Sequence, residues 1–295
     1  MKFLILLAVA LVISAIGFKK FVWFISLGYG FSVAGLGIAM IAMFFGNLTP
    51  VTVILSVLCI VYGCRLGGYL LVRERKSASY QKTMKDDIKD GSDMKFILKV
   101  VVWVSCAFLY CCQVSPVFFR LQNGAKADAA AIVGTVIMAL GIVLESASDY
   151  TKNRYKKQNP HRFCDVGLFR IVRCPNYLGE VLIWTGVFVY GVTALSGVLE
   201  WCAAIFGWIS IVYYVRSCQR AATGLKPSFS IDFAINESYF VSNMVVVLVL
   251  LKMAIVKQPK IVKQLINTGE IKIQQYAAPK NRQDCRCCLH SLPGI

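Results

Sequence analysis

Acidic residues are scarce in this chain, and they are missing altogether from its first quarter. No Asp or Glu occurs before Glu74, and charged residues make up only 16% of the 295 residues, against about 25% in an ordinary soluble domain. A carboxylate at the centre of a bilayer is costly, so membrane-spanning segments avoid it. The absence argues against a soluble N-terminal region and favours one that lies in a membrane.

Histidine is rare as well, with two in the whole chain, whereas cysteine is not, with 12. The cysteines follow no repeated spacing, and many lie inside apolar runs, where free thiols behave as small hydrophobes. The tail cluster of Cys285, Cys287 and Cys288 lacks the four spaced ligands of a structural zinc site. We therefore predict no metal site.

What the chain has in abundance is long apolar runs, with 57% hydrophobic residues overall. A spanning helix needs about 20 mostly apolar residues. The runs predict an all-α, polytopic transmembrane helical bundle of about seven spanning helices, with a candidate eighth apolar helix near the C-terminus. They are Phe3–Phe18, Phe21–Phe45, Val51–Val72, Phe96–Phe119, Ala127–Ala147, Gly179–Ser196 and Leu199–Val215, with Phe240–Val256 as the eighth.

The net charge of +17 is concentrated in polar blocks between these runs. A soluble protein of this charge would suggest nucleic acid, but cationic loops are typical of the cytosolic side of membrane proteins. We expect no nucleic acid partner and a cytosolic position for the blocks. They are Arg73–Lys95, Tyr150–Tyr177 and Arg216–Ser238.

The same pattern divides the chain into three parts. Residues 1–50 hold the N-terminal transmembrane helices, and residues 51–220 form a membrane core with a cytosolic loop at 150–177. Residues 221–295 form a divergent C-terminal segment with an apolar helix and a basic, cysteine-containing tail. If Phe240–Val256 spans, this basic tail lies on the opposite face; otherwise the run lies in the interface, and both arrangements stay open.

The chemistry-bearing residues gather between Glu145 and Trp184. Glu145 and Asp149 are four residues apart, so on a helix they share a face. They can fix a Lys or Arg, or accept hydrogen bonds from the hydroxyls of a ligand. The seven cations that follow suit a phosphate-rich ligand, or they serve membrane topology alone.

A second helix is predicted to begin at Pro175, because proline favours the first helical turn. It presents Asn176 and Glu180 on one face, with Tyr177 adjacent. An amide and a carboxylate at this spacing can hydrogen-bond an amide-bearing ring such as nicotinamide. A glutamate this close to the membrane is costly unless it has a partner or a function.

The ordered motifs resemble one known family. Residues Gly167–Glu180 read GLFRIVRCPNYLGE and resemble the signature GLWRYSRHPNYxGE of the steroid 5-alpha-reductase-like membrane reductases, including the DUF1295 branch. The upstream stretch Ser148–Phe163, the following Trp184-Thr185-Gly186 and the segment Tyr62–Gly67 also resemble family motifs. The resemblance extends over roughly Val51 to Arg220.

This resemblance implies a seven-helix membrane reductase with NADPH in a cavity that opens to the cytosol. Hydride would pass to an activated C=C bond of a lipophilic substrate such as a sterol, polyprenoid or fatty enoyl lipid. Asn176, Tyr177 and Glu180 would hold the nicotinamide end. The remaining cofactor contacts that it implies are Arg65, Asp149, Lys156, Arg162, Arg170 and Arg173.

The resemblance also implies a proton donor. In the steroid-reducing members, a tyrosine three residues before the matching arginine protonates the enone oxygen, together with a glutamate on an earlier helix. Tyr62 lies three residues before Arg65, on the same helical face, and is the implied catalytic residue. The earlier glutamate has no counterpart here, and Cys174 stands where the signature has histidine.

Two other functions remain open on the sequence. One is an S-adenosylmethionine-dependent methyltransferase of the isoprenylcysteine carboxyl methyltransferase type, which carries a similar R-H-P-x-Y motif. The other is a family relative that keeps the fold without catalysis. We expect an integral multi-pass protein of the endoplasmic reticulum in a eukaryote, or of the inner membrane in a bacterium. Membrane lipids surround it, and no obligate protein partner is evident.

Overall fold

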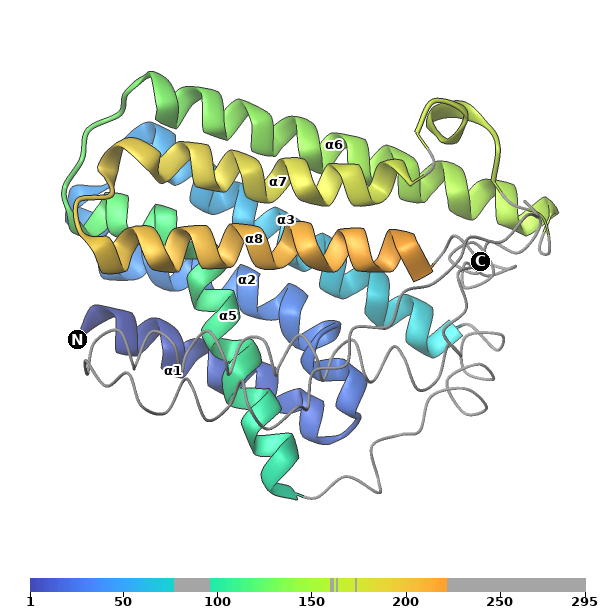
Figure 1. Ribbon diagram of the computed structural model, residues 1–295, viewed down its shortest axis with the longest axis horizontal. Coiled ribbons are helices and arrows are strands. Elements are labelled where there is room, and N and C mark those ends of the chain that lie inside the picture. The colour runs from blue at the N-terminus through green and yellow to red at the C-terminus, as the bar shows by residue number, and fades with distance from the viewer. Residues whose placement is uncertain (77–95, 160–161, 163, 173, 222–295) are drawn as a thin grey trace, which may run out of the picture.

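The computed structural model describes residues 1–76, 96–159, 162, 164–172 and 174–221, and over these ranges the chain is helical with no strand (Figure 1). The α-helices have the following bounds: α1 Lys2–Ser14, α2 Leu27–Met43, α3 Pro50–Lys76, α5 Phe96–Gln122, α6 Ala129–Gln158, α7 Pro175–Gly191 and α8 Val198–Ala221. Short 3-10 turns at Ala15–Phe18, Phe21–Phe24 and Gly167–Arg170 bridge several of them.

Five helical segments are long and apolar enough to cross a membrane, and two shorter apolar helices accompany them. The five are Phe21–Met43, Pro50–Arg75, Phe96–Gln122, Ala129–Gln158 and Pro175–Ala194, and the shorter two are Lys2–Phe18 and Val198–Tyr214. All seven runs expected in this part of the chain are therefore helical. The expected run Phe240–Val256 lies outside the described residues.

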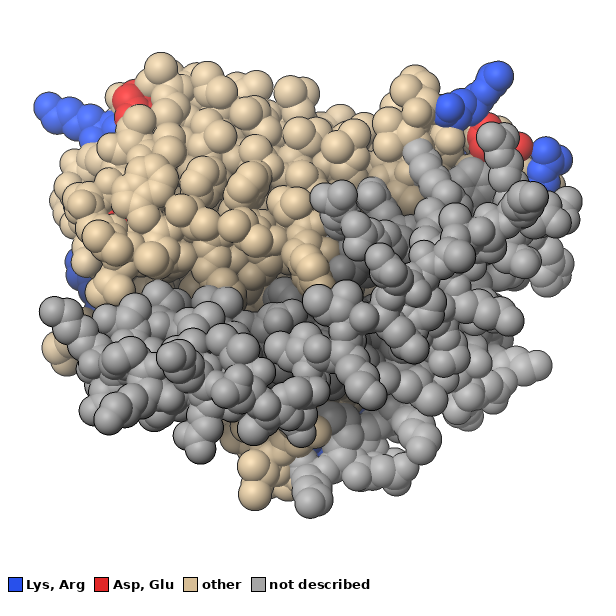
Figure 2. Space-filling view, viewed as in Figure 1, with Lys and Arg blue, Asp and Glu red and all other residues tan. Residues whose placement is uncertain are grey.

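The surface of this bundle is that of a membrane protein. On α6, Val133, Val136, Leu140 and Val143 are each at least half exposed and fall on one helical face. In Figure 2 the charged side chains on the uncovered surface gather at the two ends of the long axis, with an uncharged band between them. A soluble protein rarely exposes such a stripe, whereas a bilayer covers it.

The helix α6 is longer than the apolar run that predicted it. The expected run ends at Ala147, but α6 continues to Gln158, so the first part of the expected loop at 150–177 is helical. No glycine or proline interrupts residues 142–159, and Pro160 follows. A 30-residue helix is about 45 Å long, so its polar end projects beyond a hydrocarbon layer of about 30 Å.

The helices α6 and α7 pack along their length, as Figure 1 shows. Glycines permit this contact: a Cβ added to Gly186 would lie 2.5 Å from the Met138 nitrogen, and one added to Gly179 would lie 2.7 Å from the Cβ of Glu145. Small residues let membrane helices approach backbone to backbone. The close approach at Gly179 brings Glu180, its neighbour on α7, towards Glu145 on α6.

The far end of α7 is fixed by Arg120, which is 1% exposed. Its guanidinium donates to the backbone oxygens of Tyr190 and Lys126 and to both carboxylate oxygens of Asp128, at 2.6–3.0 Å. Burial opposes ionisation of Asp128, but hydrogen bonds from Thr193 and the Ala131 backbone and the charge of Arg120 together lower its pKa. This clamp joins α5, α6 and α7 at the end opposite the candidate site.

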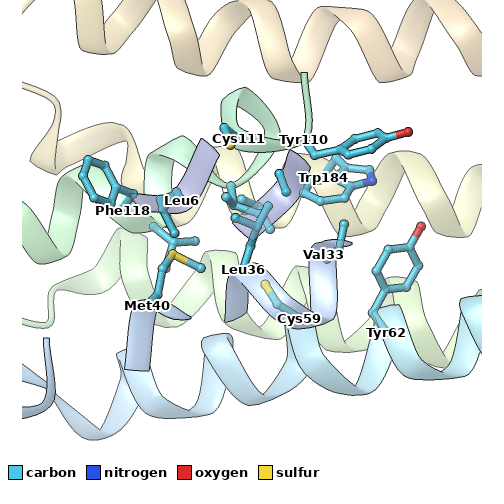
Figure 3. Packing of buried hydrophobic residues seen from close by; sticks show 14 of the residues in the cluster. Leu6, Val33, Leu36, Met40, Cys59, Tyr62, Tyr110, Cys111, Phe118 and Trp184 are labelled. Atoms are coloured by element: carbon cyan, nitrogen blue, oxygen red, sulfur yellow. The ribbon is translucent and has the colours of Figure 1, made fainter. Parts of the chain in front are cut away.

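The core lies between α1, α2, α3, α5, α6 and α7. Figure 3 shows Leu6 of α1 and Met40 of α2 near Phe118 of α5 at one end, and Tyr62 of α3 near Trp184 of α7 at the other. The apolar half is ordinary packing, whereas the aromatic half carries hydroxyl and indole groups in the membrane interior. Buried polar groups of this kind need partners.

Candidate functional site

The site begins where α2 crosses α3. A Cβ added to Gly63 would lie 2.4 Å from the oxygen of Gly30, and one added to Gly30 would lie 2.7 Å from the nitrogen of Gly67. Only glycine permits two helix backbones to approach this closely. The crossing places Tyr29 and Tyr62, the residues before Gly30 and Gly63, side by side.

The two tyrosines form a polar cluster with α7. The Tyr29 and Tyr62 hydroxyl oxygens are 3.2 Å apart, and they lie 3.3 and 3.5 Å from Oε1 of Glu180. The Trp184 indole donates to the Tyr29 oxygen at 2.7 Å. Tyr62 is fully buried and Tyr29 nearly so, so the three helices hold these groups away from bulk water.

Arg65 lies one turn along α3 from Tyr62 and pairs with two carboxylates of α6. Its Nη1 is 2.7 Å from Oε1 of Glu145, and its Nη2 donates to Asp149. The sequence left two roles open for Glu145 and Asp149: to fix a cation, or to accept hydrogen bonds from a ligand. In the structure, both carboxylates fix Arg65. Both Glu145 and Asp149 have side chains less than 15% exposed.

Three carboxyl groups, those of Glu145, Asp149 and Glu180, lie around the guanidinium of Arg65. Lys152 and Arg73 add positive charge near Asp149. In addition, Oε2 of Glu145 is buried and has no hydrogen-bond partner among the described residues. A buried acceptor without a donor is costly, and such an atom is a candidate for contact with a ligand.

The remaining sequence-predicted residues are dispersed. Asn176 and Tyr177 are half-buried in the first turn of α7, which begins at Pro175 as expected. Lys156 is buried near the end of α6, whereas Arg170 is exposed in the turn that precedes α7. Arg173 lies outside the described residues.

Arg162 lies on the surface. Its Nη2 is 3.1 Å from Oδ2 of Asp165, and the two side chains are 69% and 49% exposed. A hydrogen bond from Tyr155, reinforced by Arg162, lowers the pKa of Asp165 despite some desolvation. The structure thus brings Tyr62, Arg65, Asp149 and Glu180 together and leaves Arg162 on the surface.

Two residues of the cluster were not predicted as site residues. Tyr29 lies in an apolar run that contains no acidic residue, and in such a run the sequence predicts only a packing role for an aromatic residue. Trp184 was noticed only as part of a motif. The one sequence signal for Tyr29 is the pair of flanking glycines, Gly28 and Gly30, which marks a close helix approach.

Comparison with known proteins places this geometry in a family context. The family described as "Protein of unknown function (DUF1295)" matches residues 11–222. Steroid 5-alpha-reductase DET2 of Arabidopsis thaliana is 28% identical over 91 residues, which is 30% of this chain and 29% of that protein. The uncharacterized protein C594.04c of Schizosaccharomyces pombe is 42% identical over 58 residues, 20% of this chain and 16% of that protein.

The matched segments therefore span less than a third of either relative. No solved structure matches the chain significantly.

Proposed function

This chain belongs to the DUF1295 family, and on that premise we propose that it is a membrane-embedded reductase that uses NADPH to reduce an activated C=C bond of a lipophilic substrate. The observation that carries the proposal is the cluster of the buried Tyr62 with the partly buried Arg65, Asp149 and Glu180 at the meeting of α3, α6 and α7. A relative named as a steroid 5-alpha-reductase supports the reaction class.

The residues present fit a nicotinamide and its ribose. When bound, NADPH would supply the hydride, and its nicotinamide ring would carry a positive charge after the transfer. The carboxyl groups of Glu180 and Glu145 favour positive charge beside them. Asn176 offers an amide one turn before Glu180, and the unpartnered Oε2 of Glu145 can accept a hydrogen bond from a hydroxyl or carboxamide donor.

The phosphates belong elsewhere, because three carboxyl groups would repel them. Lys156 lies in the last turn of α6 and Arg170 in the turn that precedes α7. We assign these two to the phosphates, together with Arg173, which lies outside the described residues. Arg65 is already engaged by Glu145 and Asp149, so we assign it to holding those carboxylates in place. Arg162 extends the cationic surface.

Tyr62 is the residue we assign to proton donation. Its hydroxyl is the buried acid nearest Glu180 on α3, and a carbonyl conjugated to the C=C bond would accept its hydrogen bond. Polarising that carbonyl draws hydride to the β-carbon, and the tyrosine proton then neutralises the enolate. Exclusion of water by the surrounding helices strengthens these interactions.

The position of the cluster limits the substrate. Tyr62 lies inside an apolar helix of the bundle, so a substrate must reach it from the lipid or along an apolar path. A sterol, a polyprenoid or a fatty enoyl lipid meets this requirement. The host membrane follows the source: endoplasmic reticulum in a eukaryote, inner membrane in a bacterium.

A ligand-dependent melting shift of the purified protein in detergent tests the proposal. NADPH at about 100 times its dissociation constant adds roughly 2.7 kcal/mol to the folded state, so the melting temperature should rise with NADPH and not with S-adenosylmethionine. Asn176→Ala and Glu180→Gln should lose this shift, because they remove contacts to the nicotinamide.

Asn123→Ala and Glu200→Gln are the matched controls. Both side chains belong to a polar group at the opposite end of the bundle, where Asn123 donates to Glu200 at 3.0 Å. These variants lower the starting melting temperature but should keep the NADPH shift. A shift with S-adenosylmethionine alone would establish the methyltransferase instead.

A further inference from the structure

The α2 helix contributes a buried tyrosine that the proposed reaction has not yet used. Tyr29 lies in the first turn of α2 and is 8% exposed. Its hydroxyl oxygen is in hydrogen-bond reach of three groups: the Trp184 indole at 2.7 Å, the Tyr62 hydroxyl at 3.2 Å and Oε1 of Glu180 at 3.3 Å. Packing alone does not require a hydroxyl here, because phenylalanine would fill nearly the same space.

The chemistry of these groups fixes the direction of one hydrogen bond. An indole N–H can only donate, so the Tyr29 oxygen accepts from Trp184. The Tyr29 proton is then directed to the Tyr62 oxygen or to Glu180. When it points to Tyr62, the Tyr62 oxygen accepts it, and the Tyr62 proton is left for another acceptor.

Accepting a hydrogen bond from Trp184 has a second effect. It stabilises negative charge on the Tyr29 oxygen, and hydrogen bonds in a chain polarise one another in a low-dielectric interior. Trp184, Tyr29 and Tyr62 thus form an ordered series of donors that ends at the residue we assign to proton donation. Glu180 borders both tyrosines, and its carboxyl group accepts a hydrogen bond from each of them.

We propose that Tyr29 is a positioning residue that orients Tyr62 and resupplies its proton, an inference that rests on the proposed function. As hydride adds to the β-carbon, the Tyr62 O–H bond breaks and an O–H bond forms on the carbonyl oxygen of the substrate. The Tyr29 proton moves to the Tyr62 oxygen. A solvent proton, passed through the Glu180 carboxyl group, restores Tyr29. The enol then loses its O–H proton to solvent as a proton adds to the α-carbon, so each turnover consumes one hydride and, in net, one solvent proton.

An oxyanion-binding assay tests this without turnover. The probe is the steroidal naphthol equilenin, whose fluorescence distinguishes naphthol from naphtholate and whose oxyanion resembles an enolate. With NADP⁺ present, the wild-type protein should bind the naphtholate. Tyr62→Phe and Tyr29→Phe should each weaken that binding roughly tenfold, the effect of losing one hydrogen bond to a charged group.

The double variant Tyr29→Phe/Tyr62→Phe separates positioning from independent packing. If Tyr29 acts through Tyr62, the double variant binds the naphtholate no more weakly than Tyr62→Phe alone, because the two effects are coupled. The variant Tyr29→Phe/Trp184→Phe removes the donor and the acceptor of one hydrogen bond together. Neither group is then left buried without its partner, so this variant controls for a folding defect in Tyr29→Phe. Tyr190→Phe is the control, since its buried hydroxyl bonds Thr52 at 2.7 Å outside the cluster.

The NADPH melting shift, measured on every variant, keeps the two proposals apart. If the wild-type protein shows no NADPH shift, the proposed function fails. If the NADPH shift persists, two results would overturn the inference about Tyr29. One is that Tyr29→Phe binds the naphtholate as tightly as the wild type does. The other is that the losses of naphtholate affinity in Tyr29→Phe and Tyr62→Phe add fully in the double variant. Failure of the wild type to bind the naphtholate overturns the inference too.

Discussion

Arg65 illustrates what single residues contribute here. It lies one turn along α3 from the buried Tyr62, and two carboxylates of α6 hold it. Removing one partner of a buried ion pair leaves the other charged groups desolvated, which costs more than the pair itself contributes. The arginine therefore stabilises the arrangement of Glu145 and Asp149, whether or not a ligand is bound.

We expect Arg65→Gln to lower the free energy of unfolding by about 3 kcal/mol, the range for breaking a buried pair. Adding Glu145→Gln should restore part of the loss, because one uncompensated carboxylate is then neutral. Thermal or denaturant unfolding in detergent measures both. Arg162→Gln is the control, because its pair with Asp165 is exposed and exposed pairs contribute about 0–1 kcal/mol. Equal losses in the two single variants would refute the structural role of Arg65.

At this scale the sequence predicted part of the candidate site. Motif resemblance singled out Tyr62, Arg65, Asp149 and Glu180, and the structure brings their side chains together, while their roles stay predictions. It could not show that Glu145 and Asp149 engage Arg65, because that depends on how α3 packs on α6. It missed Tyr29, because a tyrosine in an apolar run has the same pattern whether it packs or takes part in chemistry.

At the scale of helices, the close approach of α6 and α7 positions Glu180. The approach depends on glycines at the contact: Gly186 faces Met138 and Gly134 of α6, and Gly179 faces Glu145. These contacts are backbone against backbone, so neither helix can yield by turning a side chain. The separation of the two helices, and hence the distance from Glu180 to Glu145, is set by residues that have no side chain.

Gly186→Ala should therefore force α6 and α7 apart and destabilise the protein by about 1–3 kcal/mol, the cost of overpacking. Because the shift is transmitted to Glu180, affinity for NADPH should fall as well. Unfolding and melting-shift measurements report the two effects. Gly68→Ala on α3 is the control, since nothing lies within 4 Å of an added Cβ. A Gly186→Ala protein as stable as Gly68→Ala would show that the helix contact is not tight.

Hydropathy predicted which segments are helical, but it did not predict where each helix ends. The apolar run predicted the end of one helix at Ala147, whereas α6 reaches Gln158. Hydropathy reports where the membrane ends, and the helix ends only where the backbone can no longer continue, before Pro160. The start of α7 was predicted, because Pro175 is a local signal that acts through its own fixed backbone angle.

At the scale of the whole molecule, the charged groups and the candidate site occupy different positions along the length of the bundle. The polar ends of α6 and α7 lie at one end of the bundle, and the Arg120 clamp lies at the other (Figure 1). The tyrosine and carboxyl cluster lies between them, closer to the polar end of α6. On the proposed function, a water-soluble dinucleotide would approach the site from the polar end of the bundle and a lipid from its apolar surface.

The measurement that tests this account most directly is isotope transfer. Membranes from cells that lack the gene should contain the unreduced lipid. Purified protein and NADPH deuterated at C4, supplied in both stereochemical forms, should convert that lipid to a product heavier by one deuterium and one hydrogen, detected by mass spectrometry. Tyr62→Phe protein should bind NADPH but form little product. Transfer of a labelled methyl group from S-adenosylmethionine, with no deuterium from either form of NADPH, would contradict the account.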